Sequence, residues 1–419
     1  MDRADSAFWD DESHLPGHAL HRIASAEGSW LVEESGRRLF DAGSGHSCVN
    51  LGYANEDLIA AMAESSRRLA YCSPEHHARP VQALADALSD RLGGGYRVRY
   101  ATTGGAANEL AIEIARRFWR HQGQPAKRRV IAFERAYHGS TGAASYASGP
   151  GILQSPLVDR SAEFIHVAGA RDPVAGVPRG LDVIRAGVDA AIAEAGAGTI
   201  AAIIVEPIAF AGGVIVPPPG FLAMLAELCR AHDLLLIVDE VINGFGRSGA
   251  FFAFQHEAGV RPDIVTMGKG ITSAYYPLSA TAVDRRIFET FRIPGQAMSK
   301  VITMAGHPVG CDIALKVLEI MDRDGLVDRV RANAERHLSH LMALRGTPGL
   351  RDVRGKGHMW GLEFHSEAAA EAVDARCLDA GILLLRTGNQ IRINPPLVAT
   401  RQELDFLLRT LVEAVRAAR

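Results

Sequence analysis

Short apolar runs separated by longer amphipathic stretches make up most of the chain between residues 96 and 284. Buried parallel strands have this pattern, because helices cover both faces of the sheet and leave few polar positions along a strand. The stretch "ANELAIEIARRF" places its apolar residues on one helical face, as a covering helix would. We therefore expect an open, mostly parallel α/β sheet. The predicted strands lie in "YRVRYATT", "RRVIAFERAY", "TIAAIIVEPI", "LLLIVDEVI", "DIVTMGKG" and "PLSATAVD".

The two ends of the chain have a different pattern. Beyond residue 300, long helical patterns alternate with short strand-like pieces at "VRGKGHMWGLEF" and "QIRINPPL", which is typical of a smaller α+β unit. Near the N-terminus, "GSWLVEESGRRLFDAGSG" predicts a hairpin. We therefore expect a large domain at 56–299 and a small domain built from 1–55 together with 300–419.

Composition narrows the class of ligand. The chain has 419 residues, 47% of them hydrophobic, which is enough for a large core and two subdomains. The charges of its 45 basic and 48 acidic residues nearly cancel. The sequence contains no block of like charge that could bind along the phosphate backbone of a nucleic acid. We expect a small-molecule ligand and no nucleic-acid partner.

The cysteines and the N-terminus indicate where the protein works. Five scattered cysteines form no CxxC pair, so we expect reduced thiols, no metal site and a cytoplasmic location. The first residues, "MDRADSAFWDDESHLPGHAL", are acidic and polar, unlike a signal peptide. No apolar run reaches the ~18 residues of a membrane span, so no membrane association is expected.

The stretch "LLLIVDEVINGFGRSG" contains Gly244-x-Gly246-x-x-Gly249, the spacing of a dinucleotide fingerprint. A true fingerprint opens a helix that meets a pyrophosphate. Here the carboxylate of Asp239 precedes the glycines, and "AFFAFQHEAGVRP" after them is a poor helix. We therefore interpret the glycines as a tight loop beside a site whose important charge is Asp239.

Asp239 and Lys269 each follow an apolar strand, where open α/β sheets bind ligands. Taken singly, the aspartate also fits a loop anchor and the lysine a solvated loop residue. Pyridoxal 5′-phosphate (PLP) joins the two observations: Lys269 supplies the amine for a Schiff base and Asp239 pairs with the protonated pyridine nitrogen. Gly104 and Gly105 open a helix whose N–H groups suit a phosphate, and Tyr137 in "AYHGST" can stack on a ring.

With these residues in place, the chain resembles the class III aminotransferases, which are fold-type-I PLP enzymes. The resemblance covers nearly the whole chain, and "DEVINGFGRSG" followed by "MGKG" is its most specific part. It also runs through "LGYANEDLIAAM", "TTGGAANELAIEIAR", "YHGST", "IIVEPI", "PDIVTMGKGITS", "TMAGHPVGCDIAL" and "RGKGHMWGLEF".

The resemblance implies a role for each matching residue. Lys269 matches the Schiff-base lysine, Asp239 the pyridinium partner, and Val241 the side chain on the other face of the ring from Tyr137. Glu206 of "EPI" matches a carboxylate that supports the cofactor. Thr303 matches a threonine that reaches the phosphate in the neighbouring subunit, which implies a homodimer with shared sites.

Other matches concern the substrate. Arg392 in "QIRINPPL" matches the arginine that binds a substrate carboxylate, and a structural ion pair is the alternative. His46 falls in a segment that lines the pocket in relatives, and a surface or structural histidine is the alternative. Ornithine- and γ-aminobutyrate-type members carry a glutamate at the position of Ala211 that masks this arginine, so the pattern is nearer to the ω-amino acid subgroup. The family's first helix glutamate is replaced by Ala106.

The expected activity is amino transfer between an amine or ω-amino acid donor and a 2-oxo acid or other carbonyl acceptor, with ping-pong kinetics. Relatives with the same residues run aminomutase, racemase or decarboxylation chemistry, so an isomerase is the first alternative. A catalytically silent PLP-fold binding protein is the second.

Overall fold

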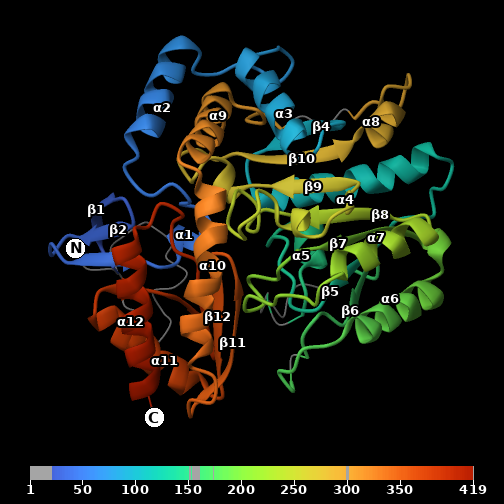
Figure 1. The fold of residues 1–419 in the computed structure, drawn as a ribbon. Helices are drawn as coiled ribbons and strands as arrows, with labels where there is room; N and C mark the ends of the chain where they lie inside the picture. The colour runs from blue at the N-terminus through green and yellow to red at the C-terminus, as the bar shows by residue number, and fades with distance from the viewer. Residues whose placement is uncertain (1–20, 151, 153–160, 173, 299–301, 419) are drawn as a thin grey trace, which may run out of the picture.

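The computed structural model describes residues 21–150, 152, 161–172, 174–298 and 302–418. Its larger part is built on a seven-stranded sheet with the strand order β4-β10-β9-β8-β7-β5-β6 (Figure 1). The strands are β4 (Tyr96–Ala101), β5 (Arg129–Phe133), β6 (Phe164–Val167), β7 (Ile200–Val205), β8 (Leu235–Asp239), β9 (Ile264–Met267) and β10 (Ser279–Asp284). All six predicted strands are present, and the structure adds β6.

Strand β10 runs against its neighbours. It pairs antiparallel with both β9 and β4, whereas the pairs from β9 to β6 are all parallel. The expectation of a mostly parallel sheet holds, but including "PLSATAVD" among the parallel strands was wrong. A fully buried strand is apolar in either direction, so hydrophobicity does not reveal its orientation.

Helices cover both faces of this sheet, as an α/β fold requires. Consecutive residues of β5 show the two faces, because Ile131 belongs to one core cluster and Ala132 to the other. One cluster contains α4, and the other contains α3 and α7. The helices of this part are α2 (Glu56–Arg68), α3 (Arg79–Arg91), α4 (Gly104–His121), α5 (Gly142–Ala147), α6 (Leu181–Ala195), α7 (Phe221–Ala231) and α8 (Arg285–Phe291).

The two ends of the chain meet in the smaller part, where β13 pairs parallel with β3. The expected hairpin is formed by β2 and β3. Two four-stranded sheets, β1-β2-β3-β13 and β11-β12-β15-β14, share one core cluster with the C-terminal helices. The strands are β1 (Ile23–Glu27), β2 (Trp30–Glu33), β3 (Arg38–Asp41), β11 (Leu350–Lys356), β12 (Met359–Phe364), β13 (Ile382–Leu383), β14 (Leu385–Thr387) and β15 (Gln390–Ile393). The helices are α1 (Ser44–Ser47), α10 (Leu326–Met342), α11 (Glu367–Asp379) and α12 (Arg401–Ala417).

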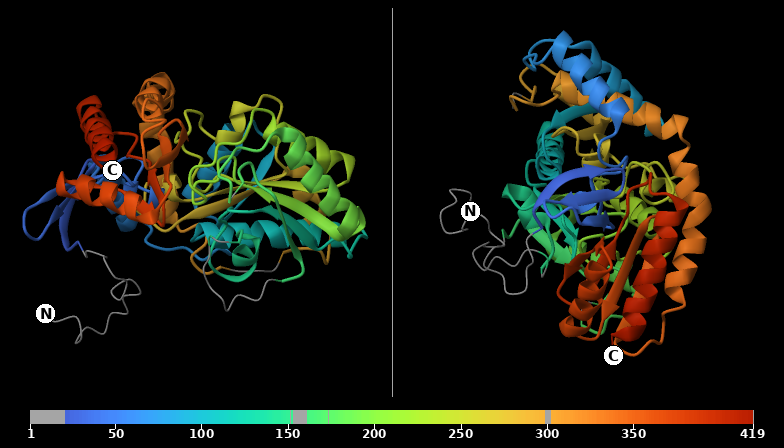
Figure 2. Two further views of the ribbon diagram at one scale, coloured as in Figure 1. Left: turned by 90° about the horizontal axis from the view of Figure 1, so that it is seen from below. Right: turned by 90° about the vertical axis from the view of Figure 1, so that its left-hand side faces the viewer.

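The helix α9 (Pro308–Arg323) connects the two parts. It packs on α2 and α3, and its buried residues belong to the core cluster of the large sheet. Gly325, in the left-handed region with φ 55°, separates α9 from α10. Figure 2 shows these two orange helices running along one side of the molecule. The domain boundary at residue 300 stays a prediction, and the structure adds that α9 packs with the large sheet.

Across the described ranges, no helix is long and apolar enough to span a membrane. The five cysteines are all free.

Candidate functional site

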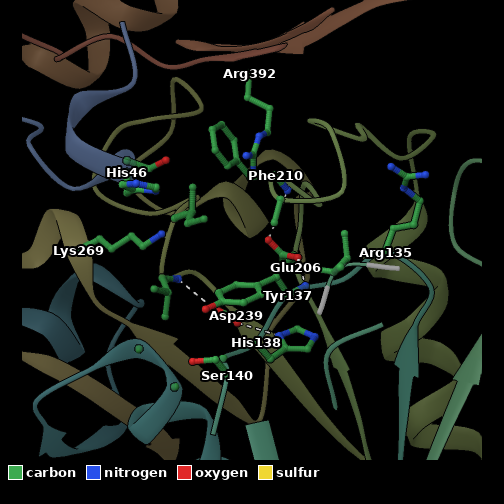
Figure 3. A pocket seen from close by; sticks show the side chains of 18 of the residues that line it. His46, Arg135, Tyr137, His138, Ser140, Glu206, Phe210, Asp239, Lys269 and Arg392 are labelled. Carbon is green, nitrogen blue, oxygen red and sulfur yellow. Dashed lines mark hydrogen bonds and ion pairs between the residues drawn. The ribbon is translucent and has the colours of Figure 1, made fainter. Parts of the chain in front are cut away.

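A cavity of about 1000 Å³ opens at the carboxyl ends of the central strands (Figure 3). Asp239 ends β8, while Glu206 and Lys269 lie just beyond β7 and β9. The N-terminus of α4 forms the floor, and the β14–β15 hairpin closes the cavity from the smaller part. Parallel strands whose carboxyl ends share one edge therefore bring together residues that are far apart in the sequence.

The carboxylate of Asp239 is buried and held by three N–H donors. Its Oδ2 accepts from Asn108 Nδ2 at 2.7 Å and from His138 Nδ1 at 2.8 Å, and its Oδ1 accepts from the Val241 amide at 3.0 Å. An ionised carboxylate only accepts, so Nδ1 of His138 is the donor. Thr266 donates to Asn108 at 2.7 Å and fixes the amide in turn. This network holds a negative charge at one fixed point of the cavity.

Asn108 and His138 are the residues that sequence reasoning missed here. Asn108 is 1% exposed on the otherwise apolar buried face of α4, and a buried polar group needs a partner. That interruption was a usable signal. His138 stands next to the predicted Tyr137, and no spacing rule connects it to Asp239.

Lys269 points into the same cavity. It begins a short 3-10 helix with φ 44°, a strained backbone for a residue with a side chain. Burial lowers the pKa of its amine, with the neighbouring Cys48, Glu206 and Asp239 opposing the shift. No hydrogen bond or salt bridge joins its Nζ to another of the described residues. A lysine in this state has more of the neutral amine that attacks carbonyl groups.

The first turn of α4 begins with two glycines, of which Gly104 packs against the side chain of Val241 and Gly105 against the backbone of Gly139. A Cβ at Gly104 would lie 2.7 Å from Cγ1 of Val241, and one at Gly139 would lie 2.8 Å from the Cα of Gly105. Thr103 caps the helix by accepting from the Ala106 amide at 3.1 Å. Thr103, Gly104 and Gly105 line the cavity at this helix N-terminus, where the helix dipole favours an anion.

Glu206 lies between Asp239 and Arg392 on the cavity wall (Figure 3). The amide of Tyr137 donates to its Oε1 at 2.9 Å, so one bond fixes both residues. Burial raises the pKa of Glu206 to about 7. Tyr137 and Val241 also line the cavity.

Arg392 reaches the cavity from β15 of the smaller part. Its Nη2 donates to Thr387 at 2.7 Å, its guanidinium lies 5.7 Å from the ring centroid of Phe210, and its Nε has no hydrogen-bond partner. Within the described part of the chain, no carboxylate pairs with it. The structural ion pair considered as the alternative is therefore not formed with the described residues.

His46 and Thr303 lie in different surroundings. His46 lines the cavity with φ 59°, in a left-handed segment that Asp41 holds by accepting from the Gly43 and Gly45 amides. Thr303 is exposed and does not line the cavity of its own chain.

These groups fit the parts of PLP. The amine of Lys269 suits an aldehyde, the fixed carboxylate of Asp239 suits a protonated ring nitrogen, and the tightly packed glycine turn suits a phosphate. In the described ranges, no cluster of His, Cys, Asp or Glu could hold a metal ion.

Comparison with known proteins decides the family. The model of the family "Aminotransferase class-III" matches residues 14–415. The chain belongs to the class III aminotransferase family. It is 38% identical to the uncharacterized aminotransferase YhxA of Bacillus subtilis (strain 168), over 93% of this chain and 90% of that protein. It is 33% identical to the hypotaurine/taurine–pyruvate aminotransferase of Paracoccus denitrificans (strain Pd 1222), over 96% and 94%.

The solved structures give the same result. A PLP-bound amine transaminase from an uncultivated Pseudomonas species superposes with a TM-score of 0.91 at 30% identity, covering 100% of this chain and 99% of that one. The sequence-based predictions of a class III aminotransferase, of fold type I, of an enzyme and of PLP as cofactor are thereby confirmed. The role of each site residue stays a prediction.

Proposed function

We propose that this class III aminotransferase moves an amino group between an amine or ω-amino acid donor and a 2-oxo acid acceptor, in two half-reactions at one site. The observation that carries the proposal is that the amine of Lys269 and the guanidinium of Arg392, neither with a carboxylate partner among the described residues, face one cavity. The amine of Lys269 can react with a carbonyl carbon, and the guanidinium of Arg392 can bind the carboxylate of a substrate.

Besides Lys269, five residues of the cavity are assigned to direct contact with the cofactor. Gly104 and Gly105 bind the phosphate through their amides, Asp239 pairs with the ring nitrogen, and Tyr137 and Val241 enclose the ring. When bound, PLP supplies an aldehyde that condenses with amines and a protonated ring that accepts electrons. The support for Asp239 is its set of three N–H donors, which holds the carboxylate in place.

Lys269 is assigned two tasks. Its amine would hold the cofactor, and as a free amine it would take up and release the proton of the donor's α-carbon. Both tasks need a neutral amine, which the lowered pKa favours. Glu206 is assigned to the support of the cofactor, through its position beside Tyr137.

Arg392 is assigned to the carboxylate of the 2-oxo acid, and His46 to the wall against which the substrate lies. A planar guanidinium binds a carboxylate through two parallel N–H bonds. Ala211 supports this assignment, because it lines the cavity and carries no charge that would mask Arg392.

Replacing Arg392 with glutamine tests that assignment. We expect kcat/KM for pyruvate to fall about 10- to 100-fold, because a charge-assisted pair contributes about 1.5–3 kcal/mol. The half-reaction with an amine donor that has no carboxylate, such as 1-phenylethylamine, is expected to keep its rate. Equal losses for the amine and for pyruvate would show that Arg392 supports the site and does not bind the acceptor.

We also propose a homodimer in which Thr303 reaches the phosphate in the partner's site. Its exposure outside its own cavity supports this. Light scattering is expected to give twice the 44.9 kDa of one chain, and Thr303→Ala is expected to weaken PLP retention without changing that mass. A monomer that retains PLP at full occupancy would rule the arrangement out.

We propose the cytoplasm as the location. The five free thiols support a reducing compartment, and cell fractionation tests it, since recovery only outside the cytoplasm would contradict the proposal.

A further inference from the structure

A second arginine lines the cavity of the proposed active site. Arg135 follows β5, is half-buried, and lies on a different side of the cavity from Arg392 (Figure 3). Its Nε donates to the carbonyl of Gly212 at 3.1 Å, which directs the guanidinium. Neither the cofactor nor the substrate assignments above use this side chain.

The backbone at Arg135 is strained. Its φ is 62°, in the left-handed region that bulky residues avoid. Such a conformation is costly and persists where the surroundings enforce it, and these conformations cluster at functional sites. The strain places a long cationic side chain on the cavity wall, where an asparagine would adopt the same backbone more easily.

The loop between β7 and α7 connects the two arginines. Three consecutive residues of it face them: the ring of Phe210 lies 5.7 Å from the Arg392 guanidinium, Ala211 lines the cavity, and the carbonyl of Gly212 accepts from Arg135. An antiparallel β-bridge between Ala209 and Ile215 closes this part of the loop and holds residues 210–212 in place between the two arginines. With alanine at 211, the 209–215 part of this loop brings no carboxylate to either arginine.

No described acid neutralises Arg135. No carboxylate of the described residues lies within salt-bridge distance of it, and Glu363 is the only acid that raises its pKa against the lowering effect of burial. Glu363 is already paired with three other arginines, Arg354 at 2.9 Å, Arg171 at 3.3 Å and Arg351 at 3.4 Å. Arg135 is therefore left without a carboxylate partner among the described residues.

We propose that Arg135 is a second anion-binding residue of the cavity, and that it selects acceptors with a second carboxylate, that is, dicarboxylic 2-oxo acids. Arg392 then binds the carboxylate beside the oxo group and Arg135 the distal one. This inference rests on the proposed function, since it names the substrate class of the same site. The charge of Arg135 favours the second carboxylate, and the fixed direction of its guanidinium sets where that group lies.

The test compares two acceptors that differ by the distal carboxylate. Pyruvate and 2-oxoglutarate share the 2-oxo carboxylate, and 2-oxoglutarate alone has the second one. We expect Arg135→Asn, which keeps the left-handed backbone, to lower kcat/KM for 2-oxoglutarate about 10- to 100-fold, mainly through KM. For pyruvate the change is expected to stay within about 3-fold. Arg135→Lys, which keeps the charge without the fork, is expected to retain part of the preference.

Two control variants separate this effect from others. Arg120→Asn makes the same change in the last turn of α4, about 24 Å from Gly104 at 1.5 Å per residue, and is expected to leave both acceptors unaffected. Arg392→Gln is expected to impair both acceptors. A wild-type enzyme that does not use 2-oxoglutarate, or equal losses for both acceptors in Arg135→Asn, would overturn the assignment. Failure to transfer amino groups to any acceptor would instead contradict the proposed function itself.

Discussion

The Lys269→Ala variant is expected to lose at least about 10⁴-fold in turnover, since general acid–base catalysis alone contributes about 10²–10⁴-fold and this residue is assigned a covalent task as well. An alanine offers neither an amine for the cofactor nor a group that carries the proton. The two arginines of the cavity, Arg135 and Arg392, do not replace it, because a guanidinium stays protonated at any working pH and offers no nucleophilic amine. The measurement is the rate of each half-reaction after the protein has been saturated with PLP.

Two further variants test whether the loss comes from the amine. Lys269→Arg keeps a positive charge but has no nucleophilic amine, so we expect it to be as inactive as the alanine variant. Lys316→Ala removes an ammonium that pairs with Glu319 at 2.6 Å on α9, and it is expected to keep full activity. Borohydride reduction followed by mass spectrometry is expected to find PLP on Lys269 of the wild-type protein. Turnover in Lys269→Ala within 100-fold of wild type would exclude the assigned role.

The strands could be predicted because burial on both faces leaves a simple trace in the sequence. Every residue of β7 is buried, and "IAAIIV" is apolar throughout. The same property hides strand direction, so the antiparallel β10 looked like its neighbours. The helix α11 (Glu367–Asp379) was not predicted, because its buried side consists of Ala370, Val373 and Cys377, which give a weak apolar stripe.

The site could be predicted where chemistry lies at a strand end. Asp239 ends β8 and Lys269 follows β9, and these strands are neighbours in the sheet, so both residues lie at its carboxyl edge. The partners of Asp239 could not be predicted in the same way. Asn108 lies on α4 and His138 after β5, and their meeting depends on how helix and sheet pack. The proposed role of Arg135 could not be predicted either, because it depends on the hydrogen bond to the 209–215 loop and on the ion pairs that Glu363 forms with other arginines.

The Asp239→Asn variant is expected to lower turnover by roughly 10² to 10³-fold, as loss of one partner of a buried ion pair costs about 3–5 kcal/mol. The change removes the charge that we assign to the ring nitrogen of PLP. The change also disturbs the local network. In the wild-type protein, three N–H groups donate to the two oxygens of the Asp239 carboxylate. An amide accepts at one atom only. In either orientation, its NH₂ therefore faces at least one N–H group of Asn108, His138 or Val241, and the ring partner is held less firmly.

The adjacent Glu240 provides the matched control. It is fully buried, and burial raises its pKa to about 8, so at pH 7 it is mostly protonated and Glu240→Gln removes little charge. Glutamine also keeps an acceptor for the Phe254 amide, which lies 2.8 Å from Oε1 of Glu240. We expect this variant to keep turnover within about 3-fold at pH 7, while Asp239→Asn loses both turnover and PLP affinity. Equal effects of the two substitutions would mean that buried polar packing, and not the charge of Asp239, supports the reaction.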